Sequence, residues 1–176
     1  MTKRLHGASL VAAAAALALT ATPAFAVGPA QNATGTARIV KPLTLQWQQD
    51  LDLGTIILNS GAWAGATVSI TPTGTFNCDG GASTKVTCTN TTKPAQYKVT
   101  GTNNQDVKIT APDVTLTGPS GTLLMTVSRP GTPVGTVNLG NSGAAGLVFG
   151  LGGSITLNST TPDGTYTGTF NVTVDY

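Results

Sequence analysis

The stretch TYTGTFNVTVDY, residues 165–176, decides the fold. Its large apolar residues all occupy even positions: Tyr166, Phe170, Val172, Val174 and Tyr176. Thr, Asn and Asp fill the odd positions, and successive side chains of a strand point to opposite faces, so the alternation predicts a half-buried β-strand. A register slip of one residue would expose every aromatic side chain. We therefore expect this strand to be central to the core and to fix its register.

Short runs of the same kind precede this strand, separated by Gly, Pro, Asn and Asp residues. The expected strands are residues 36–47, 53–58, 67–71, 96–100, 107–109, 114–116, 123–128, 134–139 and 147–157, with a β-bulge at Gly152-Gly153. After residue 26, no apolar pattern with helical spacing extends over ten residues. Many short strands joined by turn residues predict an all-β sandwich or barrel.

The first expected strand has its apolar residues at odd positions: Ala37, Ile39, Leu43, Leu45 and Trp47. This alternation predicts a half-buried strand with Trp47 in the core. Pro42 cannot donate a ladder hydrogen bond, so the strand should lie at a sheet edge or contain a bulge there.

The N-terminus carries the features of a signal peptide. Lys3 and Arg4 precede an apolar run over residues 10–19, and Ala24-Phe25-Ala26 is a small-x-small cleavage site. The run is shorter than the roughly 20 residues that span a bilayer, and no later segment is longer, so we expect no transmembrane segment in the mature protein. We predict cleavage between Ala26 and Val27 and export to the periplasm, cell surface or medium.

The expected organisation is a signal peptide over residues 1–26, a flexible tail over 27–35 and a single β-sandwich domain over 36–176. The tail, VGPAQNATG, contains only Gly, Pro, Val and small or polar residues. The length after residue 26 suits one domain.

Charge and residue types argue against several classes of function. Of nine Lys and Arg residues, Lys3 and Arg4 lie in the signal peptide, and seven acids, all Asp, balance the rest. With no basic patch, we expect no nucleic-acid partner. The only His is His6, and Glu is absent, so a Ser-His-Asp triad is impossible and we expect no enzyme and no cofactor.

Cys78 and Cys88 are the only cysteines. An exported protein meets an oxidising compartment, so we predict a disulfide between them. The sequence FNCDGGASTKVTCTN, residues 76–90, is typical of a hairpin that turns at Asp79-Gly80-Gly81. Neither a metal site nor a redox motif suits this spacing.

Two further features are weighed as sites. Asp50 and Asp52 flank Leu51, and their carboxylates on one side of a strand could hold Ca²⁺ weakly, although solvated turn formers are the simpler interpretation. Trp63, within SGAWAG, is a candidate contact for a sugar or partner, or else it anchors its loop.

The chain resembles the bacterial secreted family known as domain of unknown function 4402. The resemblance covers residues 36–176 and rests on the ordered pieces IVKPLTL, QDLDLGTII, YKVTGTNNQDVKITAPDVTLTG, FGLGGSITL and GTYTGTFNVTVDY. Leu53 stands where relatives often have Phe. The resemblance implies an immunoglobulin-like, pilin-like sandwich on the bacterial surface, and it supplies no catalytic residues.

Two functions follow as hypotheses. The first is a non-enzymatic, fimbria-like surface subunit that assembles by β-strand addition with copies of itself or other subunits, assisted by a periplasmic chaperone. The C-terminal strand would form a wall of the acceptor groove, but residues 27–35 lack the alternating large apolar side chains of a donor. The second is a self-complete secreted binding module, an adhesin or a carbohydrate- or protein-recognition domain, with Trp63 as its contact.

Overall fold

The computed structural model describes residues 28, 30–81, 84–89, 91–131, 134–142 and 144–176. The expected signal peptide and its cleavage site lie outside these residues and stay predictions. The chain has two compact units, residues 1–37 and 38–176. In the first, the described residues are exposed and form no regular secondary structure. Within the described ranges, no helix is long and apolar enough to cross a bilayer.

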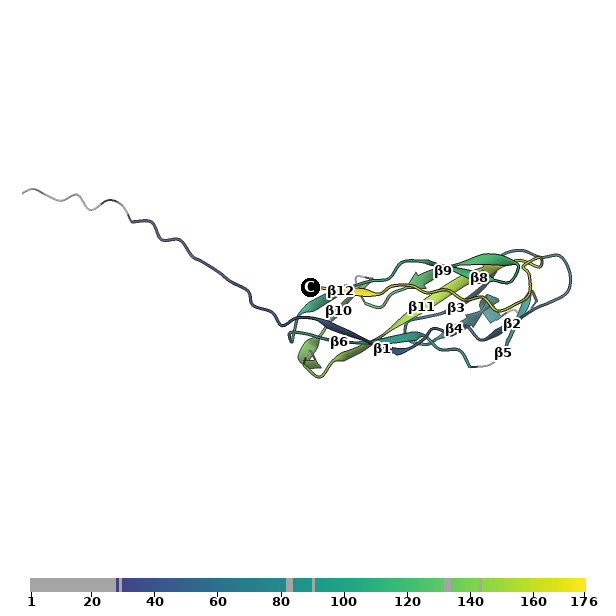
Figure 1. Ribbon diagram of the computed structural model, residues 1–176, viewed down its shortest axis with the longest axis horizontal. Coiled ribbons are helices and arrows are strands. Elements are labelled where there is room, and N and C mark those ends of the chain that lie inside the picture. Colours follow the sequence, from purple (N-terminus) through teal and green to yellow (C-terminus); the bar gives the residue numbers. More distant parts are fainter. Residues whose placement is uncertain (1–27, 29, 82–83, 90, 132–133, 143) are drawn as a thin grey trace, which may run out of the picture. The chain divides into compact units, whose positions relative to one another are not determined.

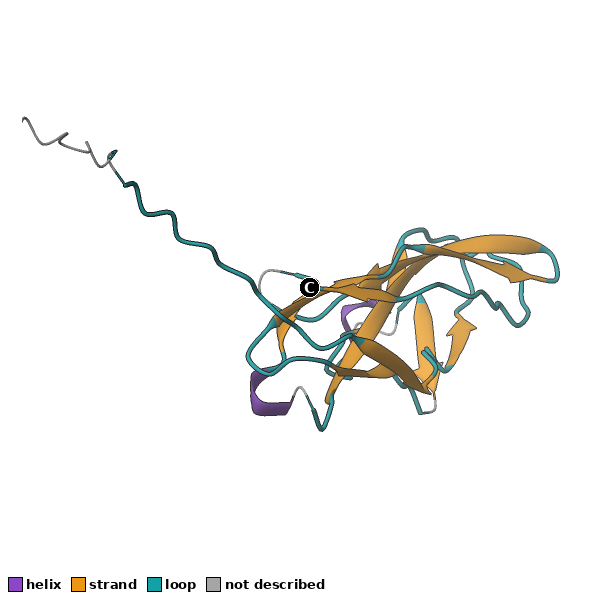
Figure 2. Ribbon diagram, turned by 60° about the vertical axis from the view of Figure 1, so that its left-hand side comes forward, coloured by secondary structure: helices purple, strands orange, loops and turns teal. Residues whose placement is uncertain are grey.

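The second unit is all-β, as the alternating patterns predict, and its strands pair antiparallel in three sheets (Figures 1 and 2). The largest sheet has the order β1-β6-β11-β3-β4, and β9 joins β11 to β8. Its strands are β1 (Thr44–Gln49), β3 (Ala66–Ile70), β4 (Phe76–Cys78), β6 (Ala95–Thr100), β8 (Val114–Gly118), β9 (Gly121–Ser128) and β11 (Leu147–Leu157).

Two smaller sheets complete the unit. The first has the order β10-β7-β12, built from β10 (Thr136–Asn138), β7 (Asp106–Thr110) and β12 (Thr173–Asp175). The second pairs β2 (Thr55–Leu58) with β5 (Val86–Thr89). Short 3₁₀ turns, η1 (Asp79–Gly81) and η2 (Gly140–Ser142), follow β4 and β10.

One apolar core joins the three sheets. Val68 of the large sheet, Ile109 of β7 and Val86 of β5 are all fully buried within it. Burying each such side chain contributes about 1.5–3 kcal/mol. The small sheets are therefore held in place by packing as well as by their own short ladders.

β11 runs through the expected bulge without a register shift. Its first half pairs with β6 up to Leu151, and its second half pairs with β3 from Gly153 onward. Gly152 stands where the partner changes, and a Cβ there would collide with the backbone oxygen of Ile70. The prediction of a bulge was wrong, because the glycine provides room for a neighbouring backbone instead.

The first strand starts later than its pattern predicts. β1 begins at Thr44, and Ile39 is 91% exposed. Trp47 is also 58% exposed, although it was expected in the core. Trp47 lies opposite Tyr97, which stacks on the buried Phe149 of β11. β1 is the edge strand of the sheet, and Trp47 is the outermost of these three side chains. Burial therefore decreases from Phe149 to Trp47, which is exposed to solvent.

The C-terminal stretch keeps its alternation but is not central. Phe170, Val172 and Val174 are half-buried and pack against the core, while the odd positions are exposed. Only β12 is a regular strand, and it pairs with β7 alone at the margin of its sheet. Alternation defines the two faces of a strand, but it does not determine which strands lie beside it.

Cys78 and Cys88 form a disulfide, with their Cα atoms 6.1 Å apart. The hairpin expected between them is absent, because β4 pairs with β3 and β5 pairs with β2. Asp79 and Gly80 adopt positive φ angles of 46° and 68° in the turn after β4. The chain thus leaves the large sheet there, and the disulfide joins it to the β2–β5 sheet.

Candidate functional site

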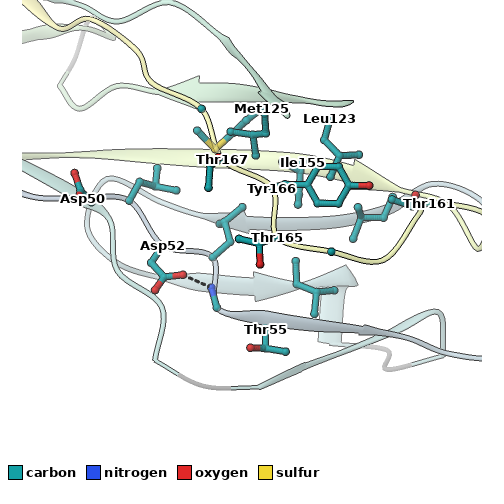
Figure 3. A pocket seen from close by; sticks show the side chains of 18 of the residues that line it. Asp50, Asp52, Thr55, Leu123, Met125, Ile155, Thr161, Thr165, Tyr166 and Thr167 are labelled. Atoms are coloured by element: carbon teal, nitrogen blue, oxygen red, sulfur yellow. Dashed lines mark hydrogen bonds between the residues drawn. The ribbon is translucent and has the colours of Figure 1, made fainter. Parts of the chain in front are cut away.

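A groove of about 840 Å³ opens between two stretches of chain that do not pair with each other (Figure 3). One wall is residues 50–58, which include β2, and the other is residues 161–170, which precede β12. We call these the β2 wall and the C-terminal wall.

The β2 wall pairs only through its far side, with β5. The backbone amide of Asn59 donates a hydrogen bond to the backbone oxygen of Lys85 at 2.9 Å. In the register of this ladder, the odd-numbered residues of the β2 wall are therefore the ones whose backbone groups bond to β5. In an antiparallel pair, backbone groups turn toward the partner at every second residue. The N–H and C=O groups of Ile56 and Leu58 therefore point toward the groove.

The C-terminal wall pairs with β8 through one isolated bridge. Thr167 exchanges two backbone hydrogen bonds with Thr117 of β8, at 2.7 and 3.0 Å. Because the backbone of Thr167 is directed to β8, an extended chain on either side of it would turn the N–H and C=O groups of Tyr166 and Gly168 away from β8. The β2 wall thus presents a strand edge to the slot, and the C-terminal wall presents the backbone on either side of one isolated bridge.

The floor of the groove is apolar and continuous with the core. It consists of side chains from β6, β8, β9 and β11: Ala95, Tyr97, Leu116, Leu123, Met125, Ile155 and Leu157. Met125 and Ile155 are buried core residues, and Figure 3 shows them beneath the C-terminal wall. An occupant of the slot would therefore place alternate side chains directly on the core.

The charged side chains that line the groove are all carboxylates: Asp50, Asp52 and Asp163. Burial raises the pKa of the Tyr97 phenol on the floor above its usual value, and the nearby Asp50 carboxylate raises it further. The slot combines a neutral apolar floor with an acidic rim. An apolar floor between two lengths of backbone is a surface on which an extended chain can lie.

All residues that line the groove belong to the part of the chain that matches a known sequence family. The family described as Domain of unknown function (DUF4402) matches residues 43–176, which include both walls and the whole floor. This chain belongs to the DUF4402 family. Neither the curated proteins nor the solved structures contain a match.

The two carboxylates weighed for calcium make local contacts in this DUF4402 domain. Asp50 accepts a hydrogen bond from the Trp47 indole at 3.0 Å. Asp52 accepts one from the Gly54 amide at 2.8 Å (Figure 3). Across the described residues, no group of three or more His, Cys, Asp or Glu side chains could hold a metal. Both contacts match the interpretation of these residues as turn formers.

Trp63 is held inside its loop. Its indole N–H donates to the Asn59 oxygen at 2.9 Å, and its backbone N–H donates to the Ser159 hydroxyl at 3.3 Å. The half-buried ring packs against the core. These contacts favour loop anchoring over an exposed contact, and the exposed tryptophan of this DUF4402 domain is Trp47.

The sequence predicted a groove wall at residues 165–176, which overlaps the C-terminal wall, but it did not predict the β2 wall or the floor. Residues 53–58 were expected as one strand among many, with nothing to set them opposite residues 161–170. The available signal was weak, because the apolar residues at even positions of 165–176 do not indicate which segment lies opposite them.

Proposed function

We propose that this chain is an exported, non-enzymatic structural subunit of the bacterial surface, with an immunoglobulin-like, pilin-like sandwich that accepts a strand from a neighbouring subunit. The observation that carries the proposal is the groove: one wall is the edge of β2, the other is the backbone beside the Thr117–Thr167 bridge, and no strand of the described residues lies between them. Exposed strand edges are templates for pairing with another chain.

An inserted strand would hydrogen-bond to both walls at once. It would join β5–β2 on one side to the C-terminal wall and β8 on the other, making one continuous sheet. Main-chain hydrogen bonds would supply affinity, and alternate side chains on the floor would supply specificity. The backbone groups now facing the slot would gain partners, which removes the cost of leaving them poorly satisfied near an apolar surface.

The proposed partners are copies of this chain or other surface subunits. The signal peptide predicted over residues 1–26 supports export, and the groove would need protection before assembly because it exposes apolar floor residues. A periplasmic chaperone that lends a strand would supply this protection.

The second candidate is a secreted binding module that is complete as a monomer. One observation favours it: Trp47 is exposed on an edge strand and is held by Asp50 at the rim of the groove. An aromatic face beside a carboxylate suits a sugar or a peptide. In that case the contact would be Trp47 rather than Trp63.

A matched pair of variants on β9 tests the groove. Leu123 lies on its floor, whereas its neighbour Leu124 is 63% exposed on the opposite face. We expect the mature protein to form laddered oligomers in size-exclusion chromatography, Leu123→Asp to abolish them and Leu124→Asp to leave them unchanged. Thermal melts check that both variants fold. A wild-type protein that stays monomeric at all concentrations would favour the binding module.

A further inference from the structure

We propose that the occupant of the groove is the segment of residues 30–40, the N-terminal arm, of a second copy of this chain. The inference rests on the proposed function and names its donor. Residues 27–35 lack the large apolar side chains of a donor, but the arm extends to residue 40 and so includes Ile39.

The arm has the pattern of a strand but no partner. Ala33, Ala37 and Ile39 share one parity, and Thr34, Thr36 and Arg38 share the other. The sequence predicted a half-buried strand over residues 36–47 and a flexible tail over 27–35, yet every residue of the arm is exposed and outside any strand. Ile39 is the most exposed large apolar side chain among the described residues. Ile39 is thus a large apolar side chain that a partner surface could bury.

The arm ends just before Lys41, the first of the described residues whose backbone is hydrogen-bonded to the β-sheet unit, residues 38–176. We call these contacts of Lys41 the anchor. The Lys41 amide donates to the Thr102 hydroxyl at 2.6 Å, and the Lys41 oxygen accepts from the Tyr176 hydroxyl at 2.6 Å. The same Tyr176 oxygen accepts from the Thr102 amide at 2.8 Å. In the described part of the chain, no backbone–backbone hydrogen bond involves a residue ahead of Lys41.

The anchor and the groove lie toward opposite ends of β6. Ala95, at the start of the strand, lines the groove, while Thr102, two residues beyond its end, holds Lys41. Seven residues of extended chain separate them by roughly 23 Å. A subunit that donates a strand near one end and accepts one at the other makes a head-to-tail contact with the next subunit. Repeated head-to-tail contacts build a filament when the rotation between successive subunits does not close a ring.

Charge also matches the arm to the groove. The charged side chains that line the groove are Asp50, Asp52 and Asp163, and no Lys or Arg of the described residues lines it. The arm carries Arg38 on the face opposite Ile39, and Lys41 follows it. With Ile39 on the apolar floor, Arg38 would face outward near the acidic rim. Such complementarity steers encounter and fixes orientation.

The decisive experiment mixes two defective chains. Ile39→Asp damages the arm and leaves the groove intact, whereas Leu123→Asp damages the groove and leaves the arm intact. Each mature variant alone should be monomeric by light scattering. An equal mixture should form a heterodimer of twice the mass, with the intact arm of the Leu123→Asp chain in the intact groove of the Ile39→Asp chain. The complex should not grow further, because its free arm and its free groove both carry a substitution. Thr165→Trp, which fills the groove from an exposed wall position, replaces Leu123→Asp if that chain does not fold.

Each outcome decides the proposal. If Leu123→Asp abolishes wild-type oligomers but Ile39→Asp does not, assembly through the groove stands and another segment is the donor, so the arm proposal is wrong. If a mixture of monomers gives no heterodimer, insertion of the arm into its own groove or no insertion at all replaces the proposal. If neither variant alters the oligomers, the proposed function fails as well.

A peptide locates the binding site independently. The probe is a synthetic peptide of residues 31–42 added to the mature Ile39→Asp chain. At ten times its dissociation constant it should slow exchange about tenfold at the amides of Ile56, Leu58 and Tyr166. The same peptide with Ile39→Asp should give no protection, and an Arg38→Ala peptide should keep most of it. Protection elsewhere, or equal protection by the Ile39→Asp peptide, would contradict the proposal.

Discussion

Cys78 and Cys88 are ten residues apart in the chain, yet their disulfide joins strands of two different sheets. Cys78 lies opposite Val68 on β3, and Cys88 lies opposite Ile56 on β2. The bond therefore fastens the β2 wall of the groove to the large sheet. A two-stranded sheet is at best marginally stable alone, so this covalent tie holds one wall of the site in place.

Breaking the disulfide should loosen that wall. We expect Cys88→Ser to lower the free energy of unfolding by roughly 2–4 kcal/mol in urea melts, the usual range for a lost bridge. Amide exchange should accelerate most at β2 and β5, since their ladder is short. The control is the wild-type protein under reducing conditions, which should behave like the variant. Unchanged exchange at β2 would mean that packing alone holds the wall.

The C-terminal wall should show its two faces in a matched pair of variants. Phe170→Ala removes a half-buried ring that packs on the core, so its cost should be roughly 2 kcal/mol, below the 3–5 kcal/mol of fully buried aromatics. Thr169→Ala, on the exposed face, should change the free energy of unfolding by no more than about 0.5 kcal/mol. Urea melts measure both. Equal losses would contradict the half-buried register of this segment.

Gly152 should tolerate no side chain. A Cβ at this position would collide with the Ile70 oxygen and the Ser128 hydroxyl, so Gly152→Ala should force β3 or β9 away from β11. We expect a loss of about 1–3 kcal/mol, as for other overpacked sites. Gly35→Ala is the control, because nothing lies within 4 Å of its added Cβ. If Gly152→Ala left the free energy of unfolding unchanged in thermal and urea melts, β3 or β9 could move away from β11 at little energetic cost.

Tyr97 should make stability fall at alkaline pH. Its pKa in the folded protein is raised above the ordinary value, so the folded state holds the proton more tightly than the unfolded state. Its contribution is complete below about pH 10 and is lost as the pH rises through the folded pKa. Urea melts of wild type and Tyr97→Phe between about pH 8 and pH 11 measure the difference. The variant should lose less stability, and equal slopes would contradict the assignment.

The sequence by itself determined the all-β class, the faces of most strands and the cysteine partners. Residues 165–176 show why, because their alternation is a local property of an extended backbone and survives in the structure even where no ladder forms. The disulfide followed equally directly, since two cysteines allow one pairing.

Only the tertiary structure decided which strands are neighbours. The pattern that predicts a buried strand at Ile39 is the same as the pattern within β3, yet one is solvated and the other fully buried. Trp47 is exposed because its row ends at an edge, and the groove exists because residues 50–58 and 161–170 meet without pairing. Alternation has a period of two residues and carries no information about partners that lie a hundred residues away, which long-range packing alone selects.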